Sequence, residues 1–339
     1  MRLVIRADAT AQMGTGHLMR CLALGQAWKD RGGEVSVITK CSNQGLLEKI
    51  NQEDFNLHYF EPLTSEADIE FTGKLVHSHP GSWVALDSPF FDSLYQKSLK
   101  EAGCNIISID DMARLPHYWA DIIINQNLHG EDMSYSCEPY TRVLAGTDYV
   151  ILRRQFLCFR GIPKQIFDKA ERILVMMGGS DPENITGRIL SALSNSEISG
   201  LNFTVVAGAA NTYIEEIKAI IGERNMNARL IQDAPNVPEL MGWADMAITS
   251  GGTTVWELAF MGVPSIVITT APIEEYLVSG LQKKGLFWTA GWFAPERLVP
   301  VLLSVMNDGM ARNEMSLKAR SLVDGFGCER ILKTIFKES

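Results

Sequence analysis

Two glycines and a histidine follow the first strand-like run of the chain, within the sequence RADATAQMGTGH. Gly14 and Gly16 allow the backbone to approach a ligand closely. His17 is expected at the start of a helix, where the positive end of the helix dipole favours a neutral imidazole that can accept a proton. Asp8 is the expected partner that orients this imidazole, and the pair predicts a general base. The alternative is that His17 is an ordinary helix residue and that Asp8 caps a loop.

A second glycine-rich segment starts at Gly178 and reads GGSDPENIT. Gly178, Gly179 and Ser180 follow an apolar run and precede a helical pattern. They could therefore form a pocket for an anion or a sugar hydroxyl. The same residues also fit an ordinary turn followed by a helix N-cap. The sequence of this segment leaves both interpretations open.

A third segment, SGGTTVWE, starts at Ser250 after another apolar run. Amides and hydroxyls are expected here at a helix N-terminus, where a diphosphate is favoured. They come from Ser250, Gly251, Gly252 and Thr253. Glu257, expected about two turns further on, could accept hydrogen bonds from ribose hydroxyls. The segment predicts a nucleotide-binding site.

Several other catalytic motifs are absent from the sequence. No GxxxxGK[ST] segment supports ATP phosphoryl transfer, and no GxSxG elbow supports a hydrolase triad around Ser180 or Ser250. The spacing of His77 and His79 could suit a metal, but no third ligand is near them in the sequence. A solvated helix end is the favoured interpretation of these two histidines. We expect neither a metal nor a cofactor.

All three segments are expected where a strand ends and a helix begins, which is where open α/β sheets place their ligands. Apolar strand-like runs alternate with helical patterns, which predicts parallel sheets covered on both faces. The expected strands are 2–6, 34–39, 83–87, 105–109, 121–124, 173–177, 203–207, 229–231, 246–249 and 265–268. The alternation is interrupted at 150–170. It predicts two Rossmann-like α/β domains, 1–155 and 165–339.

The composition is that of an ordinary globular protein, with 46% hydrophobic and 21% charged residues among 339. The formal net charge of −9 argues against a nucleic-acid partner, because phosphate-backbone surfaces need clustered Lys and Arg. A few amides and one or two basic side chains can still bind a pyrophosphate. The sequence shows no secretion signal, no apolar run of about 20 residues and no CxxC pair among six cysteines. We expect a cytoplasmic protein without stable membrane association.

The motifs resemble those of the UDP-sugar hydrolase of the pseudaminic acid pathway and of its relatives, the spore coat polysaccharide biosynthesis proteins. The shared motifs run in order along most of the chain: Arg6-x-Asp8, Gly14-x-Gly16-His17-x-x-Arg20-Cys21, Asp110-Asp111, Gly146-Thr147-Asp148-Tyr149-x-x-Leu152-Arg153-x-x-Phe156, Gly178-Gly179-Ser180-Asp181-Pro182 and Ser250-Gly251-Gly252-x-x-x-x-Glu257. The last motif is also similar to the nucleotide-binding segment of the lipid II glycosyltransferase, whose corresponding glutamate binds the UDP ribose. The resemblance implies a glycosyltransferase B-type fold, with two Rossmann-like domains facing across a cleft that holds the sugar nucleotide.

The activity implied by this resemblance is hydrolysis of UDP-2,4-diacetamido-2,4,6-trideoxy-β-L-altropyranose to UDP and the free sugar, without a metal. His17 would be the general base that activates water, and the third segment would hold UDP. The sugar pocket would be framed by Arg6, Asp8, Gly14, Gly16 and Arg20. A glycosyltransferase that passes the sugar to an acceptor other than water is the alternative, and a nucleotide-sugar sensor without catalysis is a third hypothesis.

The chain departs from the family pattern after the strand expected at 265–268. Where the family usually carries an Asn-Gln pair that faces the ligand, this chain has Glu274 and Glu275. The two carboxylates could contact sugar hydroxyls or an amino group. They could equally be solvated charges at a helix start, where the helix dipole favours them.

Overall fold

The computed structural model describes residues 1–10, 13–77, 79, 81–196 and 198–337. It consists of two compact units. The first contains Met1–Thr10, His17–Arg154 and Gly325–Ser339, and the second contains Ala11–Gly16 and Gln155–Asp324. Within the described ranges, none of the helices has the length and apolar character needed to cross a membrane.

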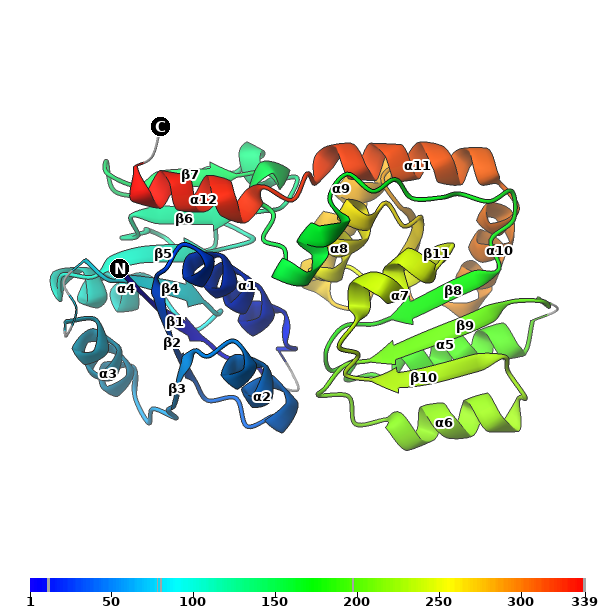
Figure 1. Cartoon of the computed structure of the whole chain (residues 1–339), viewed down its shortest axis with the longest axis horizontal. Helices are drawn as coiled ribbons and strands as arrows, with labels where there is room; N and C mark the ends of the chain where they lie inside the picture. The colour runs from blue at the N-terminus through cyan, green and yellow to red at the C-terminus, as the bar shows by residue number, and fades with distance from the viewer. Residues whose placement is uncertain (11–12, 78, 80, 197, 338–339) are drawn as a thin grey trace. The chain divides into compact units, whose positions relative to one another are not determined.

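The first unit is built on a parallel β-sheet (Figure 1). Its strands are β1 (Arg2–Ala7), β2 (Glu34–Thr39), β3 (Asn56–Tyr59), β4 (Trp83–Asp87), β5 (Asn105–Ile109), β6 (Ile122–Asn125) and β7 (Arg142–Ala145). In the described residues the strand order is β3-β2-β1-β4-β5-β6-β7, and each neighbouring pair is parallel. The chain adds β2 and β3 on one side of β1 and then returns to add β4 on the other. This reversal creates a topological switch point between β1 and β4.

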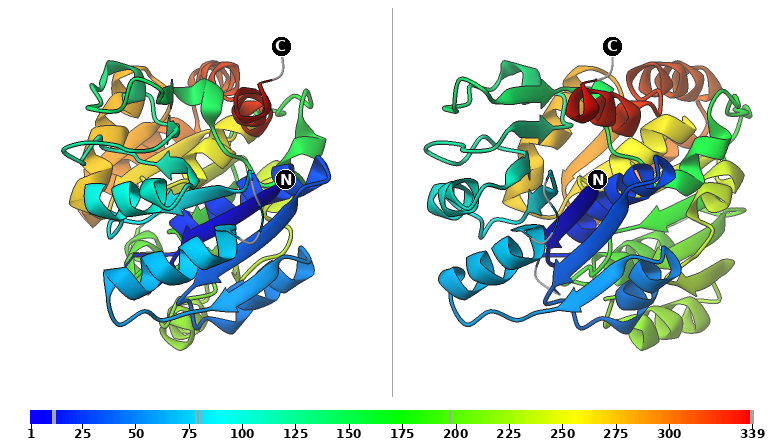
Figure 2. Two further views of the ribbon diagram at one scale, coloured as in Figure 1. Left: turned by 90° about the vertical axis from the view of Figure 1, so that its left-hand side faces the viewer. Right: turned by 60° about the vertical axis from the view of Figure 1, so that its left-hand side comes forward.

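Helices cover both faces of this sheet, as two views in Figure 2 show. They are α1 (Gly16–Asp30), α2 (Gln44–Gln52), α3 (Ser65–His77) and α4 (Ser93–Glu101), with the short 3-10 helices η1 (Gly130–Asp132) and η2 (Thr147–Tyr149). Successive strand residues point to opposite faces. Leu3 and Ile5 therefore pack in a core with α1 and α2, whereas Val4 packs in a second core with α3 and α4.

The last helix, α12 (Gly327–Phe336), belongs to the first unit. Its apolar residues Cys328, Ile331 and Ile335 are buried in the same core as Leu3 and Ile5. The predicted second domain, 165–339, is therefore wrong at its carboxyl end. Burial of one face of this amphipathic helix on the first sheet is the physical reason.

The second unit repeats the same architecture. Its strands are β8 (Arg172–Met176), β9 (Asn202–Ala207), β10 (Ala228–Gln232), β11 (Met246–Ser250), β12 (Ser265–Thr269) and β13 (Trp288–Trp292), in the order β10-β9-β8-β11-β12-β13. The helices are α5 (Ile185–Ser194), α6 (Ile214–Glu223), α7 (Val237–Trp243), α8 (Thr254–Met261), α9 (Glu275–Lys283), α10 (Pro295–Met306) and α11 (Gly309–Leu322), with the 3-10 helices η3 (Arg154–Phe159) and η4 (Pro272–Glu274). Neighbouring strands are again parallel, and the switch point lies between β8 and β11.

The prediction of two parallel α/β units is confirmed, and the expected strands agree with the observed ones to within two residues. Three strands were not predicted: β3, β7 and β13. All three lie at an edge of their sheet, and most of their residues are partly or fully exposed. Edge strands carry a mixed polar and apolar sequence, which is why no continuous apolar run marks them.

Candidate active site

Polar side chains of the first unit gather at one edge of its sheet. Asp8 follows β1, Asp87 ends β4, Asp110–Asp111 follows β5 and Asn127 lies just beyond β6. These four strands are neighbours, and the carboxyl ends of parallel strands meet at one edge. The second residue of α1 is His17, which reaches the same edge. The edge therefore holds both a candidate base and several carboxylates.

The imidazole of His17 is held by the carboxylate of Asp87. Nδ1 of His17 lies 2.7 Å from Oδ1 of Asp87. An ionised carboxylate only accepts hydrogen bonds, so Nδ1 carries the proton and Nε2 is the unprotonated nitrogen. Among the described residues, Nε2 has no hydrogen-bond partner. The side chain of His17 is 28% exposed, so Nε2 is able to accept a proton from a water molecule.

Arg20 keeps this carboxylate ionised and in place. Its Nε donates to Oδ2 of Asp87 at 2.5 Å and its Nη2 donates to Oδ1 at 2.9 Å. Burial of Asp87 opposes ionisation, but the charge of Arg20 and the hydrogen bonds from Arg20 and His17 outweigh it and hold the pKa of this carboxyl well below its usual range. Asp87 is therefore negatively charged near neutral pH, as the tautomer of His17 requires.

Asp111 extends the network on the other side of Arg20. Nη1 of Arg20 donates to Asp111 at 2.9 Å, and the side-chain amide of Asn127 donates to the same carboxylate at 2.7 Å. The backbone carbonyl of Asp111 lies 2.9 Å from Nε2 of His129. Burial raises the pKa of Asp111, but the charge and hydrogen bonds of Arg20 reverse this effect and lower it overall. The guanidinium is thus fixed between two carboxylates and cannot move without disturbing His17.

The structure corrects the expected partner of His17. The carboxylate of Asp8 accepts hydrogen bonds from Nη1 of Arg6 at 2.7 Å and from the backbone N–H of Lys40 at 2.9 Å. Asp87, not Asp8, orients the imidazole. Asp8 is only 1% exposed, so it also cannot line an open sugar pocket.

The same correction applies to Arg6, which is 2% exposed. Arg6 is two residues after Val4 in β1, so the two side chains point to the same face of the sheet, the one covered by α3 and α4. There it donates to the carboxylate of Asp68 in α3. His17 approaches the sheet from α1, on the opposite face. The alternation of side chains along β1 is therefore the physical reason why Arg6 does not line an open sugar pocket, and Asp8 is bonded to this buried guanidinium.

The glycines before His17 have distinct conformations. Gly14 has a φ of 75°, which is in the left-handed region that glycine adopts without strain. Gly16 is the first residue of α1. Ala11 and Gln12, also part of this predicted segment, lie outside the described residues.

The second predicted segment forms a capped helix start. The carboxylate of Asp181 accepts hydrogen bonds from the amides of Ile185 and Thr186 at 2.8 and 2.9 Å, and the side chain of Asn184 accepts one from Gly187. The donors at the N-terminus of α5 are thus already occupied by the chain itself. This favours the turn-and-cap interpretation for the helix end. Any ligand role is left to Gly178, Gly179 and Ser180 in the loop before it.

The third segment lies beside this loop and is arranged differently. A Cβ atom built on Gly178 would lie 3.8 Å from Oγ of Ser250, which places the two loops side by side. Thr253 precedes α8 as its N-cap residue, and among the described side chains none forms a cap hydrogen bond at this helix start. Glu257 is in the first turn of α8, not two turns further on as expected. Uncapped amides at a helix N-terminus favour an anion.

Gly251 in this segment has no room for a side chain. A Cβ atom there would lie 2.8 Å from Cβ of Glu274 and 2.8 Å from Cγ2 of Val278. The loop approaches α9 so closely that only a residue without a side chain fits at this position. It also fixes the backbone between Ser250 and the first turn of α8.

Both carboxylates of the divergent pair have partners within the second unit. Oε2 of Glu274 accepts hydrogen bonds from the backbone N–H and the hydroxyl of Thr270, and burial raises the pKa of Glu274 despite these bonds. Oε1 of Glu275 accepts a hydrogen bond from the indole of Trp292 at 2.5 Å. Glu274 therefore stabilises the turn after β12, and it is not a simple solvated charge.

Sequence reasoning missed the role of Asp87 and the contact between Asn127 and Asp111. Asp87 was predicted to end a strand, and this was the available signal, because carboxylates at the carboxyl ends of parallel strands are functional candidates. Its pairing with His17 depends on β4 being the neighbour of β1, which the sequence does not state. In the described part of the chain, no group of three or more His, Cys, Asp or Glu residues could hold a metal ion.

The chain matches a known family over residues 173–324, which correspond to the glycosyltransferase family 28 C-terminal domain. It is 26% identical to the spore coat polysaccharide biosynthesis protein SpsG of Bacillus subtilis, over 98% of this chain and 96% of that one. It is 25% identical to the UDP-2,4-diacetamido-2,4,6-trideoxy-β-L-altropyranose hydrolase of Campylobacter jejuni, over 84% of this chain and 97% of that one. A third relative, MJ1062 of Methanocaldococcus jannaschii, is 26% identical over 84% of this chain, but the match spans only 59% of its length.

Solved structures share the fold at lower sequence identity. MurG of Acinetobacter baumannii superimposes with a TM-score of 0.66 at 15% identity, over 99% of this chain and all of that one. HepE of Anabaena, solved in complex with UDP-glucose, superimposes with a TM-score of 0.66 at 11% identity and the same coverage. The predicted glycosyltransferase B-type fold is confirmed. Over most of its length the chain is similar to SpsG and to the altropyranose hydrolase, and residues 173–324 in its second unit match the glycosyltransferase family 28 C-terminal domain.

Proposed function

We propose that this protein is an enzyme that hydrolyses a UDP-linked mono- or diacetamido deoxy-sugar at the anomeric carbon, giving UDP and the free sugar. Such a reaction would serve nonulosonic (pseudaminic) acid or related surface-glycan biosynthesis. The names of the C. jejuni hydrolase and of SpsG support the substrate class and the biosynthetic setting.

The observation that carries this proposal is the His17–Asp87 pair. Asp87 holds the proton on Nδ1, which leaves Nε2 to take a proton from water as the water oxygen attacks the anomeric carbon. The bond between that carbon and the diphosphate oxygen breaks, and UDP leaves with the bonding electrons. No covalent sugar intermediate is needed for this displacement.

The second unit would bind the leaving group. The uncapped N-terminus of α8, with Ser250, Gly251, Gly252 and Thr253 before it, suits the diphosphate because amides and the helix dipole stabilise negative charge there. Glu257 in the first turn would accept hydrogen bonds from the ribose hydroxyls. A contact of this kind made in the transition state stabilises UDP as it departs.

The test is UDP release from a panel of UDP-linked mono- and diacetamido sugars, without acceptor or added metal, with NMR to follow the sugar. We expect UDP and a free reducing sugar in equal amounts. His17→Asn should lower turnover by about 10²–10⁴, the usual effect of losing a general base. Bound sugar nucleotide that is never cleaved would contradict the proposal.

A glycosyltransferase is the second candidate, because the match over residues 173–324 is to a glycosyltransferase domain. The donor site and the base would be the same, but an alcohol or amine would replace water. The two candidates differ in one measurement. A transferase releases UDP only when an acceptor is added, whereas the hydrolase needs none.

A further inference from the structure

A pocket of about 270 Å³ lies in the second unit, and none of the candidate active-site residues lines it. Its wall is formed by the segment that enters this unit together with residues of β8, α7, α8 and α11. The lining residues are Phe159, Ile162, Pro163, Lys164, Gln165, Phe167, Arg172, Gly242, Met261 and Arg320. The volume is close to the lower end of the range for small-molecule sites, roughly 300–1,000 Å³.

The pocket is at the opposite edge of the second sheet from the proposed UDP-binding segment. Arg172 is the first residue of β8, and Met261 is the last residue of α8. The loops at Gly178 and Ser250 follow the carboxyl ends of β8 and β11. At about 3.3 Å per residue, a strand of this length separates the two edges by roughly 15 Å. A ligand in the pocket is therefore distinct from one bound at the N-terminus of α8.

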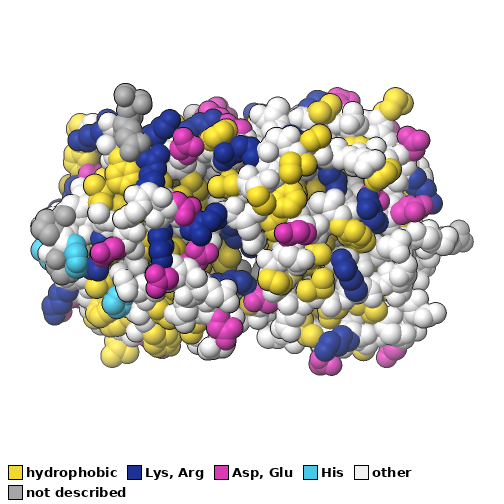
Figure 3. All heavy atoms as spheres, viewed as in Figure 1, with side chains coloured by type: hydrophobic (Ala, Val, Ile, Leu, Met, Phe, Trp, Pro, Cys, Tyr) yellow, Lys and Arg dark blue, Asp and Glu magenta, His cyan; other side chains and the backbone are white. Residues whose placement is uncertain are grey.

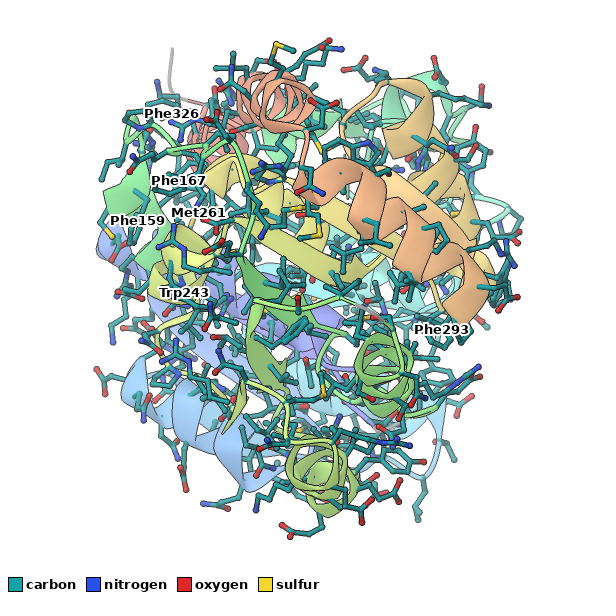
Figure 4. All side chains as sticks on the ribbon, turned by 90° about the vertical axis from the view of Figure 1, so that its right-hand side faces the viewer. Phe159, Phe167, Trp243, Met261, Phe293 and Phe326 are labelled. Carbon is teal, nitrogen blue, oxygen red and sulfur yellow. The ribbon has the colours of Figure 1, made fainter. Side chains whose placement is uncertain are left out.

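One side of the pocket is apolar and aromatic. Figure 4 shows Phe159, Phe167, Met261 and Trp243 close together on this face of the second unit. The guanidinium of Arg172 lies 5.3 Å from the ring centre of Phe167 and 5.9 Å from that of Trp243. The rings are thus held in place by a cation that is itself part of the wall. In the space-filling view of Figure 3, hydrophobic and basic side chains adjoin on the visible face of this unit.

The charged part of the wall is entirely basic. Lys164, Arg172 and Arg320 line the pocket, and none of its lining residues in the described chain is acidic. Asp245, which does not line the pocket, accepts a hydrogen bond from the guanidinium of Arg172 at 2.6 Å. Within the described chain, Lys164 and Arg320 form no ion pair. Lys164 donates to the carbonyl of Gly242 at 2.6 Å and Arg320 donates to the carbonyl of Ile162, so both are fixed by neutral acceptors.

This arrangement leaves positive charge without a counterion. Burial lowers the pKa of Lys164 to about 8, and the charge of Asp245 only partly offsets this effect. A buried or half-buried cation is stabilised by an anion within hydrogen-bond reach. The overall charge of −9 makes a local group of basic residues more notable, because it is not part of a general basic surface.

We propose that this pocket binds a small amphipathic anion: a carboxylate or phosphate ester group between Lys164 and Arg320, carried on an aromatic ring or short branched chain that packs against Phe159, Phe167 and Met261. The shared chemistry of the head group is a planar or tetrahedral oxyanion that accepts several charge-assisted hydrogen bonds. The apolar part is required, because about half of the wall is hydrophobic.

Titration calorimetry on the full chain tests this with four probes: 3-phenylpropionate, phenyl phosphate, the neutral 3-phenylpropanamide and inorganic phosphate. We expect one of the two amphipathic anions to bind one to one, and the amide and inorganic phosphate to bind at least about tenfold more weakly. Preference between the two anions identifies the head group. Equal binding of the amide, or equal binding of inorganic phosphate, would overturn the proposal, as would no binding of either anion.

Variants locate the site. Arg320→Gln and Lys164→Gln should each weaken binding by about tenfold, through loss of one charge-assisted contact. Met261→Trp should remove binding by filling the pocket, provided that its melting transition is retained. The matched control is Lys318→Gln on the same helix, where the lysine pairs with Glu314 and does not line the pocket. Unchanged affinity in Arg320→Gln and Lys164→Gln, or displacement of the probe by UDP, would refute this placement.

Discussion

Replacing Asp87 by Asn keeps the shape of the side chain but removes its charge and one acceptor. Arg20 donates to both carboxylate oxygens, and Nδ1 of His17 donates to one of them. An amide has a single acceptor oxygen, so in either orientation its NH₂ group faces a donor. If the oxygen keeps the 2.5 Å bond to Nε of Arg20, the NH₂ group faces His17. The imidazole then gains most by moving its proton to Nε2, where it can no longer accept one from water.

The expected loss follows from the role of the base. Removal of a positioned general base lowers the rate by about 10²–10⁴, which corresponds to about 3–5 kcal/mol of activation free energy. Because Asp87 acts only through His17, the effects of the two residues should not add. The double variant His17→Ala, Asp87→Asn should therefore be about as slow as His17→Ala alone.

The assay is UDP release at saturating sugar nucleotide, together with calorimetric UDP affinity and thermal unfolding. The matched control is Asp121→Asn, because Asp121 pairs with Lys100 at 2.6 Å near the opposite edge of the same sheet. This control should lose stability but keep its turnover number. The reasoning is refuted if Asp87→Asn retains turnover within about threefold of the parent while His17→Ala is inactive.

Three further predictions concern pH, the loop and the last helix. Burial lowers the pKa of Lys164 in the folded protein to about 8, below its ordinary value of 10.5. Between these two pH values the unfolded chain binds more protons than the folded one, so the free energy of unfolding should rise with pH. Lys164→Met should abolish that rise in urea-unfolding curves, and a rise retained in the variant would contradict this assignment. Gly251→Ala should weaken UDP binding and cost about 1–3 kcal/mol of stability through its contact with α9. Gly280→Ala should be neutral or stabilising in calorimetry and unfolding, because outside its own helix the described residues leave open space around the added carbon. Ile331→Ala in α12 should lower the free energy of unfolding by about 2–5 kcal/mol and expose the first unit to proteolysis. The control is Leu317→Ala, where the leucine is 63% exposed and neither effect is expected. Equal effects of the two variants would argue against the packing of α12 on the first core.

The sequence by itself determined the class of the fold and most of its internal strands. Buried parallel strands need apolar side chains on both faces, so each of them left a continuous apolar run that is visible locally. β4, for example, was predicted with the bounds that the structure has, Trp83–Asp87. The three glycine-rich segments were also placed correctly between a strand and a helix, because turn and capping residues act over a few positions of the chain.

Contacts between distant residues were decided only by the tertiary structure. His17 and Asp87 are 70 positions apart, and they meet because β4 returns to the side of β1. The local interpretation instead paired His17 with Asp8, whose carboxylate accepts hydrogen bonds from Arg6 and from the backbone N–H of Lys40. The last helix, α12, was assigned to the second unit by its position in the chain, but its apolar face packs on the first core. Local periodicity predicts whether a segment forms a helix or a strand. Strand order and the packing of a helix face depend instead on the free energy of the whole chain.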